Sequence, residues 1–310
     1  MRRIDRRWRS AGGLLLATLA AAGGAEAQVE QAPPTPNCPA CAEWNAPHAP
    51  FHIFGNTWYV GTHGLAAILL TSDEGHVLID GGLAESAAPI AASIRALGFR
   101  LEDVELIVNS HVHYDHAGGI GALQRASGAA VAASPSSAAV LERGVSGPDD
   151  PQYGILPPID PVRAVRVIAD GEVLRVGSLA ITAHFTPGHT PGGTSWSWRS
   201  CENDRCLEFV YADSQTPVSA DDFLYSRSPR YPAAVQDFER GFAALERLPC
   251  DVLITPHPAA SNLWERLAAR DRGEAGALGD GQGCRRYAAA AREALARRLE
   301  REAAERQAPR

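Results

Sequence analysis

Short apolar runs with the alternation and the β-branched character of strands dominate the chain from Phe51 onward. In the first half they predict strands at residues 51–62, 66–72, 76–82, 104–110 and 129–134. Between these runs, Ile90, Ile94 and Leu97 recur at helical spacing before Gly98, and further helices are expected at residues 117–127 and 136–144. Such alternation of strands and helices is typical of an α/β domain.

The second half repeats this pattern after a polar, proline-containing loop that runs from Ser146 to Pro161. Strands are expected at residues 164–169, 172–176, 179–185, 194–200, 207–213 and 251–256, and a helix at 231–248. An amphipathic helix at 285–300, packed on the outside, is predicted by apolar residues at four-residue spacing, namely Tyr287, Ala291, Leu295 and Leu299. The charged residues after Glu300 are expected to fray.

The first 27 residues have the three parts of a secretory signal peptide. Five arginines precede an apolar run from Ala11 to Ala22 that is too short to span a bilayer, and Ala25-Glu26-Ala27 is a small-residue cleavage site. We expect cleavage before Gln28 and a periplasmic or secreted protein. Proline-rich residues 28–49 are expected to form an extended arm, and residues 50–310 a single domain, because no internal linker is evident.

The charge of the chain narrows its possible partners. All 29 basic residues are arginine, and removal of five arginines and two acidic residues with residues 1–27 leaves 24 arginines against 34 acids, a formal charge of −10. A surface of this sign disfavours nucleic acids and other polyanions as partners. Removal of the signal peptide also leaves no segment expected to associate with a membrane.

Six cysteines in an exported chain favour disulfides over thiol chemistry. They sort into three local pairs: Cys201 with Cys206, Cys250 with Cys284, and Cys38 with Cys41. The first pair flanks a polar turn and would pin a hairpin, and the second would tie the C-terminal helix to the sheet. The third is a C-x-x-C, which can be half of a zinc site, but no second pair at matching spacing completes one, so a structural bridge is favoured.

The densest group of potential metal ligands is the segment NSHVHYDHAGG, residues 109–119, which directly follows a predicted buried strand. His111 and His113 have the i, i+2 spacing that points both side chains the same way in an extended loop. Asp115 and His116 follow at the start of the next helix. Four ligand-type residues in six positions at the carboxyl end of a strand predict a metal site, their division into two and two suits a pair of ions, and imidazole favours zinc.

One loop cannot complete the coordination of two metal ions, so further ligands are expected at later strand ends. His189 follows the predicted strand 179–185 in a glycine-containing turn, and His257 follows the last strand between Pro256 and Pro258. The remaining histidines have no ligand-type neighbours at chelating spacing, and packing or surface roles are expected for His48, His52, His63, His76 and the strand residue His184.

The segments HVHYDH, TPGHTPGGTSW, YADSQTP and TPHP, in this order behind VLIDGG, resemble those of the metallo-β-lactamase superfamily, and within it subclass B3 of the class B β-lactamases. The resemblance covers nearly all of the mature chain. It implies an αβ/βα four-layer sandwich of two mixed sheets with external helices, and two Zn²⁺ at one edge. The implied ligands are His111, His113 and His189 for the first zinc and Asp115, His116 and His257 for the second, with Asp80 supporting the loop behind the metals.

The segment YADSQTP distinguishes between branches of this superfamily. Glyoxalase II and related lactonases use a metal-bridging aspartate at this point, whereas in subclass B3 a serine, here Ser214, meets the substrate carboxylate together with the residue two along, Thr216. A shift of one residue in the alignment would instead make Asp213 a bridging ligand and the chain a different hydrolase. Gln152, in the loop between residues 146 and 161, resembles a residue that reaches the substrate.

The resemblance implies hydrolysis of the β-lactam amide of penicillins, cephalosporins and carbapenems by a zinc-activated hydroxide that Asp115 orients, and hence antibiotic resistance. The expected partner is a small β-lactam, and the expected state is a monomer. The absence of S-x-x-K and G-x-S-x-G motifs agrees with a mechanism without a serine nucleophile. Two alternatives are another hydrolase of this fold, acting on a lactone or a thioester, and a non-catalytic zinc-binding protein, which a site with an open coordination position disfavours.

Overall fold

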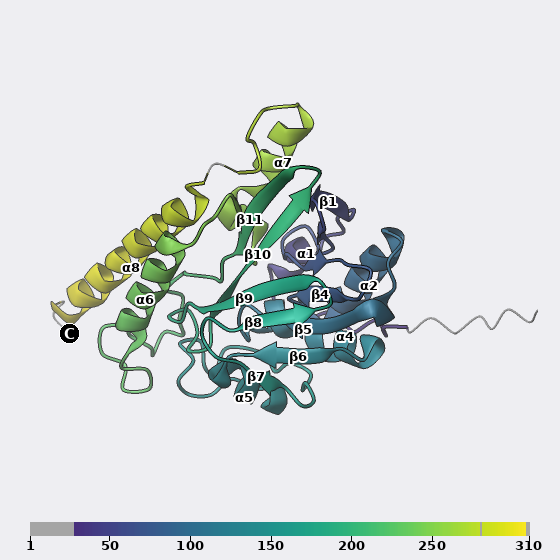
Figure 1. Cartoon of the computed structure of the whole chain (residues 1–310). Coiled ribbons are helices and arrows are strands. Elements are labelled where there is room, and N and C mark those ends of the chain that lie inside the picture. Colours follow the sequence, from purple (N-terminus) through teal and green to yellow (C-terminus); the bar gives the residue numbers. More distant parts are fainter. Residues whose placement is uncertain (1–27, 280, 308–310) are drawn as a thin grey trace, which may run out of the picture.

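The computed structural model describes residues 28–279 and 281–307, so the predicted signal peptide lies outside the described residues (Figure 1). Within them, the strands form two mixed sheets. The seven-stranded sheet has the order β1-β2-β3-β4-β5-β6-β7, and the five-stranded sheet has the order β12-β11-β10-β9-β8. None of the described helices is long and apolar enough to cross a membrane.

The strands of the seven-stranded sheet each lie in a segment that the apolar pattern predicted. They are β1 (Phe51–Phe54), β2 (Thr57–Tyr59), β3 (Ile68–Leu70), β4 (His76–Ile79), β5 (Val104–Val108), β6 (Ala130–Ala133) and β7 (Arg166–Val167). Strands β1 to β4 pair antiparallel, and β4 to β7 pair parallel. The carboxyl ends of β4 and β5 therefore meet at one edge.

The five-stranded sheet contains β8 (Val173–Val176), β9 (Leu179–Phe185), β10 (Thr194–Glu202), β11 (Arg205–Tyr211) and β12 (Val252–Ile254). Because β9 and β11 are both antiparallel to β10, and β12 is parallel to β11, the strands β9, β11 and β12 end at the same edge. The β10–β11 hairpin is longer than predicted. It pairs Cys201 with Cys206 in register, and a disulfide joins the two.

The helices are α1 (Cys41–Trp44), α2 (Ala87–Ala96), α3 (Tyr114–Ala117), α4 (Ile120–Ser127), α5 (Pro135–Arg143), α6 (Ala234–Arg247), α7 (Leu263–Asp271) and α8 (Gly283–Gln307), with short 3₁₀ turns η1 (Ala84–Ser86), η2 (Leu101–Asp103) and η3 (Pro258–Ser261). Helix α7 was not predicted. It buries Leu263 and Leu267, which are four residues apart, against the core between the sheets.

Three apolar cores separate four layers of secondary structure. The central core lies between the two sheets, where Val108 of one meets Trp196 and Phe209 of the other. A second core joins the seven-stranded sheet to α2, α4 and α5, and a third joins the five-stranded sheet to α6 and α8. Figure 1 shows α6 and α8 on the opposite flank from α2 and α4. This arrangement confirms the predicted αβ/βα sandwich.

The expectation that the chain frays after Glu300 was wrong, because α8 continues to Gln307. Glu302 is only 2% exposed, and its carboxylate accepts the backbone N–H groups of Tyr225 (3.0 Å) and Ser226 (2.8 Å) and the guanidinium of Arg298 (2.7 Å). Burial raises the pKa of Glu302, but the hydrogen bonds from Ser226 and Arg298 outweigh it and hold this pKa below its usual range. These contacts hold the end of the helix against the preceding loop.

The expectation of a wholly extended N-terminal arm was also wrong, because the arm contains the helical turn α1. Cys38 and Cys41 form a disulfide at the start of this turn. Earlier in the arm, Thr35 donates hydrogen bonds from its backbone N–H and its hydroxyl to the carboxylate of Glu85, both at 2.8 Å. The arm is therefore attached to the domain.

The remaining predicted cysteine pair, Cys250 and Cys284, also forms a disulfide. It joins the residue two positions before β12 to the first turn of α8, and both cysteines lie in the core beneath that helix. The bridge therefore ties α8 to the five-stranded sheet, as the sequence predicted.

Candidate metal centre

The candidate ligands lie at the edge of the sandwich where strands of both sheets end. Asp80 follows β4, the loop with His111 follows β5, His189 follows β9, Ser214 follows β11 and His257 follows β12. Residues that follow the carboxyl ends of strands have left the hydrogen-bonded ladder, and open α/β sheets place their binding sites there. Two separate sheets thus contribute to one centre.

Hydrogen bonds between the two sheets fix their relative position at this edge. The backbone N–H of Thr194 donates to the carbonyl of Ser110 (2.8 Å), and the indole N–H of Trp196 donates to the carbonyl of Asn109 (2.9 Å). Both acceptors belong to the segment that immediately precedes the histidine cluster. The position of the cluster therefore depends on the second sheet as well as on its own strand.

Asp80 holds the same segment, residues 109–110, through hydrogen bonds to Ser110. Its carboxylate accepts hydrogen bonds from the backbone N–H and the hydroxyl of Ser110, both at 2.7 Å, and from the hydroxyl of Tyr211 at 2.8 Å. Asp80 adopts a left-handed backbone conformation with φ of 63° and is fully buried, and this burial raises its pKa. The contacts agree with the supporting role that the resemblance implied.

Three histidines form the first candidate metal group. His111, His113 and His189 are buried, and one potential ligand atom from each lies within 4.8 Å of the others. Nε2 of His111 is buried with no hydrogen-bond partner among the described residues. Burial lowers the pKa of His111 well below its ordinary value and that of His189 to about 3. Both imidazoles are therefore neutral at neutral pH, which is the form that coordinates a metal.

The opposite ring nitrogen of each of these histidines is held by an acceptor of the protein. Nδ1 of His111 lies 2.8 Å from a carboxylate oxygen of Asp213, Nε2 of His113 lies 3.2 Å from both carboxylate oxygens of Asp150, and Nδ1 of His189 lies 2.7 Å from the carbonyl oxygen of Thr216. Metal-ligating histidines typically donate their second ring N–H in this way, which fixes the tautomer and the ring orientation.

The second candidate group is centred on Asp115. Its Oδ2 lies 3.1 Å from Nε2 of His116 and 3.3 Å from Nε2 of His257. These distances match the ~3.3 Å edge of a tetrahedron with metal–ligand bonds of about 2.0–2.1 Å. Burial raises the pKa of Asp115, but His116 and His257 outweigh it and hold this pKa well below its usual range, so the carboxylate is ionised.

The structure thus brings together all six residues named from the sequence as metal ligands. His111 also lies within 4.8 Å of Asp115 and His116, so the two groups adjoin. Five imidazoles and one carboxylate, with the unpartnered Nε2 of His111 among them, form a donor set that fits zinc.

The three residues expected to bind substrate also lie near this centre. The side-chain amide nitrogen of Gln152 is 3.3 Å from Nδ1 of His113. Thr216 is exposed, and its hydroxyl lies 3.4 Å from Nδ1 of His189. Ser214 is buried at 7% exposure and lies three residues after the end of β11, next to Asp213, whose carboxylate contacts His111. Gln152 and Thr216 thus each contact a histidine of the first candidate group.

Comparisons with known proteins agree with this geometry. The family model of the metallo-beta-lactamase superfamily matches residues 60–197. Among solved structures, Rm3 metallo-beta-lactamase has 57% sequence identity to this chain and superposes with a TM-score of 0.84. The match covers 86% of this chain and 99% of that one. MEM-A1, a subclass B3 metallo-beta-lactamase from a soil metagenome library, is 52% identical, with a TM-score of 0.83, and the match covers 84% and 99%.

The chain belongs to the metallo-β-lactamase superfamily, within subclass B3.

A curated relative from another branch of the superfamily is more distant. Hydroxyacylglutathione hydrolase of Cereibacter sphaeroides is 28% identical over 169 residues, which is 54% of this chain and 52% of that protein. The chain therefore spans about half the length of this curated relative, whereas it spans nearly all of Rm3 and MEM-A1.

Sequence reasoning missed Asp150 and considered Asp213 only as a possible metal ligand. Both instead hold ring nitrogens of ligand histidines in this superfamily member. Tyr287 of α8 was predicted only as an apolar helix position, yet its hydroxyl donates to the carbonyl of Asp213 (3.1 Å) and accepts the backbone N–H of Gln215 (3.2 Å). The signal for these roles is that each polar side chain is buried and so needs hydrogen-bond partners. A local sequence pattern does not show which polar side chains are buried.

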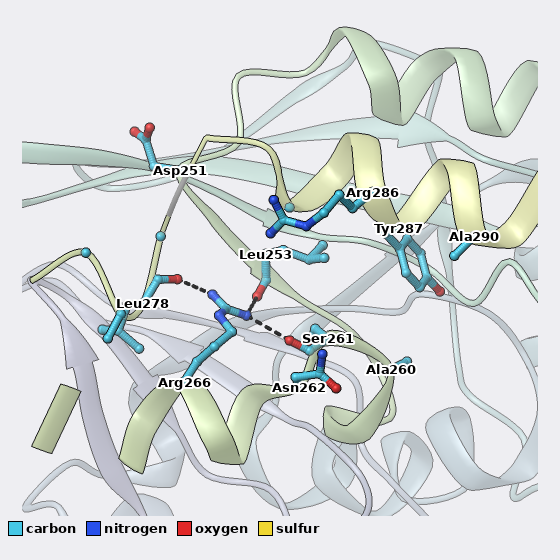
Figure 2. A pocket seen from close by; sticks show the side chains of 14 residues that line it. Asp251, Leu253, Ala260, Ser261, Asn262, Arg266, Leu278, Arg286, Tyr287 and Ala290 are labelled. Atoms are coloured by element: carbon cyan, nitrogen blue, oxygen red, sulfur yellow. Dashed lines mark hydrogen bonds between the residues drawn. The ribbon is translucent and has the colours of Figure 1, made fainter. Parts of the chain in front are cut away.

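A cavity of about 460 Å³ lies between α7 and α8 (Figure 2), and none of the six candidate metal ligands lines it. The guanidinium of Arg266 in its wall donates to the carbonyls of Leu253 (2.7 Å) and Ser261 (3.2 Å). Among the described residues that line this cavity, Asp251 is the only one of a metal-ligand type. Its wall residue Tyr287 donates a hydrogen bond to the carbonyl of Asp213, and its wall residue Ala260 donates its backbone N–H to the carbonyl of His257.

Proposed function

We propose that the chain is an exported, zinc-dependent β-lactamase that hydrolyses the amide of penicillins, cephalosporins and carbapenems and so confers resistance to them. Similarity to Rm3 metallo-beta-lactamase over nearly the whole of that chain supports this function. In this proposal the chain acts as a monomer in the periplasm or outside the cell, after cleavage of the predicted signal peptide before Gln28.

The position of Asp213 is the observation that carries the proposal. Its carboxylate lies 2.8 Å from Nδ1 of His111, while the unpartnered nitrogen of that ring is Nε2. Because the two nitrogens of an imidazole point in different directions, a carboxylate at Nδ1 lies behind the ring and does not bridge metals at Nε2. This geometry favours Ser214, rather than Asp213, as the residue of this segment that faces the substrate.

The residues of the centre fit a hydrolysis that needs no protein nucleophile. A bound zinc pair supplies Lewis acidity and a water whose pKa is lowered to about 7. The ionised carboxylate of Asp115 accepts a hydrogen bond from the attacking water and orients it towards the lactam carbonyl. His111, His113 and His189 are each held at their second ring nitrogen by an acceptor of the protein, so they need not reorganise during the reaction.

Ser214, Thr216 and Gln152 bind the substrate in this proposal. Hydroxyl groups at Ser214 and Thr216 donate hydrogen bonds to the carboxylate that β-lactams carry. The carbonyl of Thr216 also accepts the Nδ1–H of His189. A displacement of this segment would therefore disturb both substrate binding and a metal ligand.

The test is the hydrolysis of a chromogenic cephalosporin and a carbapenem by residues 28–310, before and after chelation and again after zinc is restored. We expect turnover that chelation abolishes and zinc recovers. His189→Ala should lower kcat/KM by more than the 10–100-fold that is typical of removing an outer-sphere partner. His184→Ala, in the same segment but bonded to Ser197 outside the centre, is the matched control and should retain activity. Absence of lactam turnover in folded, zinc-loaded protein would refute the proposal.

A thioester or lactone hydrolase is the second candidate, because the curated relatives include a hydroxyacylglutathione hydrolase and an N-acyl homoserine lactonase. The same zinc-loaded sample should therefore be assayed with a glutathione thioester and an acyl lactone. Turnover of either substrate, without turnover of a β-lactam, would support this second function. It would also favour the alternative in which Asp213 is a metal-bridging ligand.

A further inference from the structure

Asp150 is the buried carboxylate of the loop between residues 146 and 161. It is 3% exposed, while Pro148 and Asp149 before it are exposed. A buried carboxylate is costly unless hydrogen-bond donors or charges compensate it. The groups that compensate the buried carboxylate of Asp150 therefore indicate its role in this loop.

The carboxylate joins the loop to a metal ligand. Both oxygens of Asp150 lie 3.2 Å from Nε2 of His113, and Oδ1 also accepts the backbone N–H of Gln152 at 2.8 Å. The backbone N–H of Asp150 donates to the carbonyl of Gly147, and its own carbonyl accepts the N–H of Tyr153, both at 3.0 Å. One residue thus closes a turn of the loop and reaches the imidazole.

These contacts determine which nitrogen of His113 can bind a metal. An ionised carboxylate only accepts hydrogen bonds, so Nε2 of His113 carries the hydrogen and the lone pair lies on Nδ1. The side-chain amide of Gln152 approaches that Nδ1 edge at 3.3 Å. The loop therefore contacts both nitrogens of the same ring, whereas His111 and His189 are held from the segment that follows β11.

We propose that Asp150 is a positioning residue that couples the first metal position to the loop between residues 146 and 161. Its carboxylate orients His113 for the metal, and through the N–H of Gln152 it sets where the substrate-facing part of the loop lies. The coupling is reciprocal, so an ordered loop tightens metal binding and a bound metal orders the loop. This inference rests on the metal-binding part of the proposed function and not on the identity of the substrate.

The test compares Asp150→Asn with Asp149→Asn, its exposed neighbour, which undergoes the same change of charge. Zinc affinity is measured by competition with a chromogenic chelator, and folding is checked by circular dichroism. We expect Asp150→Asn to weaken the affinity for the first zinc about 10–100-fold, as loss of an outer-sphere partner does, and Asp149→Asn to stay within about twofold of the wild type. Equal affinities for the two variants would overturn the proposal, whatever the substrate proves to be.

Hydrogen exchange of the wild-type protein gives a second test that needs no variant. Because metal binding and loop order are coupled, saturating zinc should slow hydrogen exchange of the backbone amides of Gln152 and Tyr153 about tenfold or more. The distant turn of residues 203–204 is the internal reference, and any change in its exchange is subtracted. The same exchange in the presence and absence of zinc would refute the coupling. Neither measurement uses β-lactam hydrolysis, so failure of the coupling and failure of the proposed activity are distinguishable.

Discussion

The disulfide between Cys250 and Cys284 joins residues 34 positions apart in the sequence, whereas the one between Cys201 and Cys206 joins residues five positions apart. In the chain-entropy treatment, the entropy removed from the unfolded state grows with the logarithm of loop length. At 25 °C the two bridges then contribute about 3.8 and about 2.1 kcal/mol respectively. Replacing each pair by alanine should therefore destabilise the first variant by about 1.7 kcal/mol more than the second.

The longer bridge also has a functional consequence. It anchors the first turn of α8, and Tyr287, three residues after Cys284, holds the carbonyl of Asp213 and the amide of Gln215. Loss of the anchor should loosen the segment that contains Ser214. We therefore expect the Cys250→Ala, Cys284→Ala double variant to lose activity as well as stability.

Urea unfolding of the two zinc-loaded double variants, followed by circular dichroism, measures the difference. The free energy of unfolding is taken from the midpoint and the slope m, and an unchanged m shows that the native and unfolded states remain comparable. The hairpin variant is the control, because its cysteines lie at the far end of β10 and β11 from the metal centre. Equal destabilisation, or a larger effect of the hairpin bridge at equal m, would refute the reasoning from loop length.

Three further predictions concern individual side chains. Glu302→Gln should lower the free energy of unfolding above the ordinary pKa of 4.5, and the difference from wild type should disappear as pH falls through the lower folded-state pKa; a difference that persists at pH 2 would contradict this. Tyr287→Phe should cost about 1–2 kcal/mol in urea unfolding and raise KM, because the N–H of Gln215 loses its acceptor, and unchanged values of both would argue against the link to the site. Asp80→Asn should cost about 1–3 kcal/mol, since it loses acceptors for buried donors, while Asp73→Asn in an exposed turn should be neutral by the same measurement; equal effects would contradict the supporting role of Asp80.

Local patterns in the sequence were sufficient to predict the strands and to locate the candidate metal site. The apolar runs predicted the strands of both sheets because alternation and β-branched character are properties of neighbouring residues. Chelating spacing in residues 111–116 is likewise local, and the two later ligands could be found because His189 and His257 each follow a strand. The resemblance of these motifs to a family then gave the correct layering of the fold.

Only the tertiary structure determined which hydrogen-bond partners the histidine rings and the buried carboxylates have. Asp213 lies 102 residues from His111 in the sequence, and Asp150 lies 37 residues from His113, so no local pattern relates the members of either pair. The same holds for Glu302, whose partner Tyr225 is 77 residues away and whose burial keeps the C-terminal helix from fraying. The sequence by itself determined which residues can bind a metal, because that is a matter of side-chain chemistry and spacing. The folded chain determined which nitrogen of each ring faces the centre, because orientation depends on hydrogen-bond partners that only packing brings together.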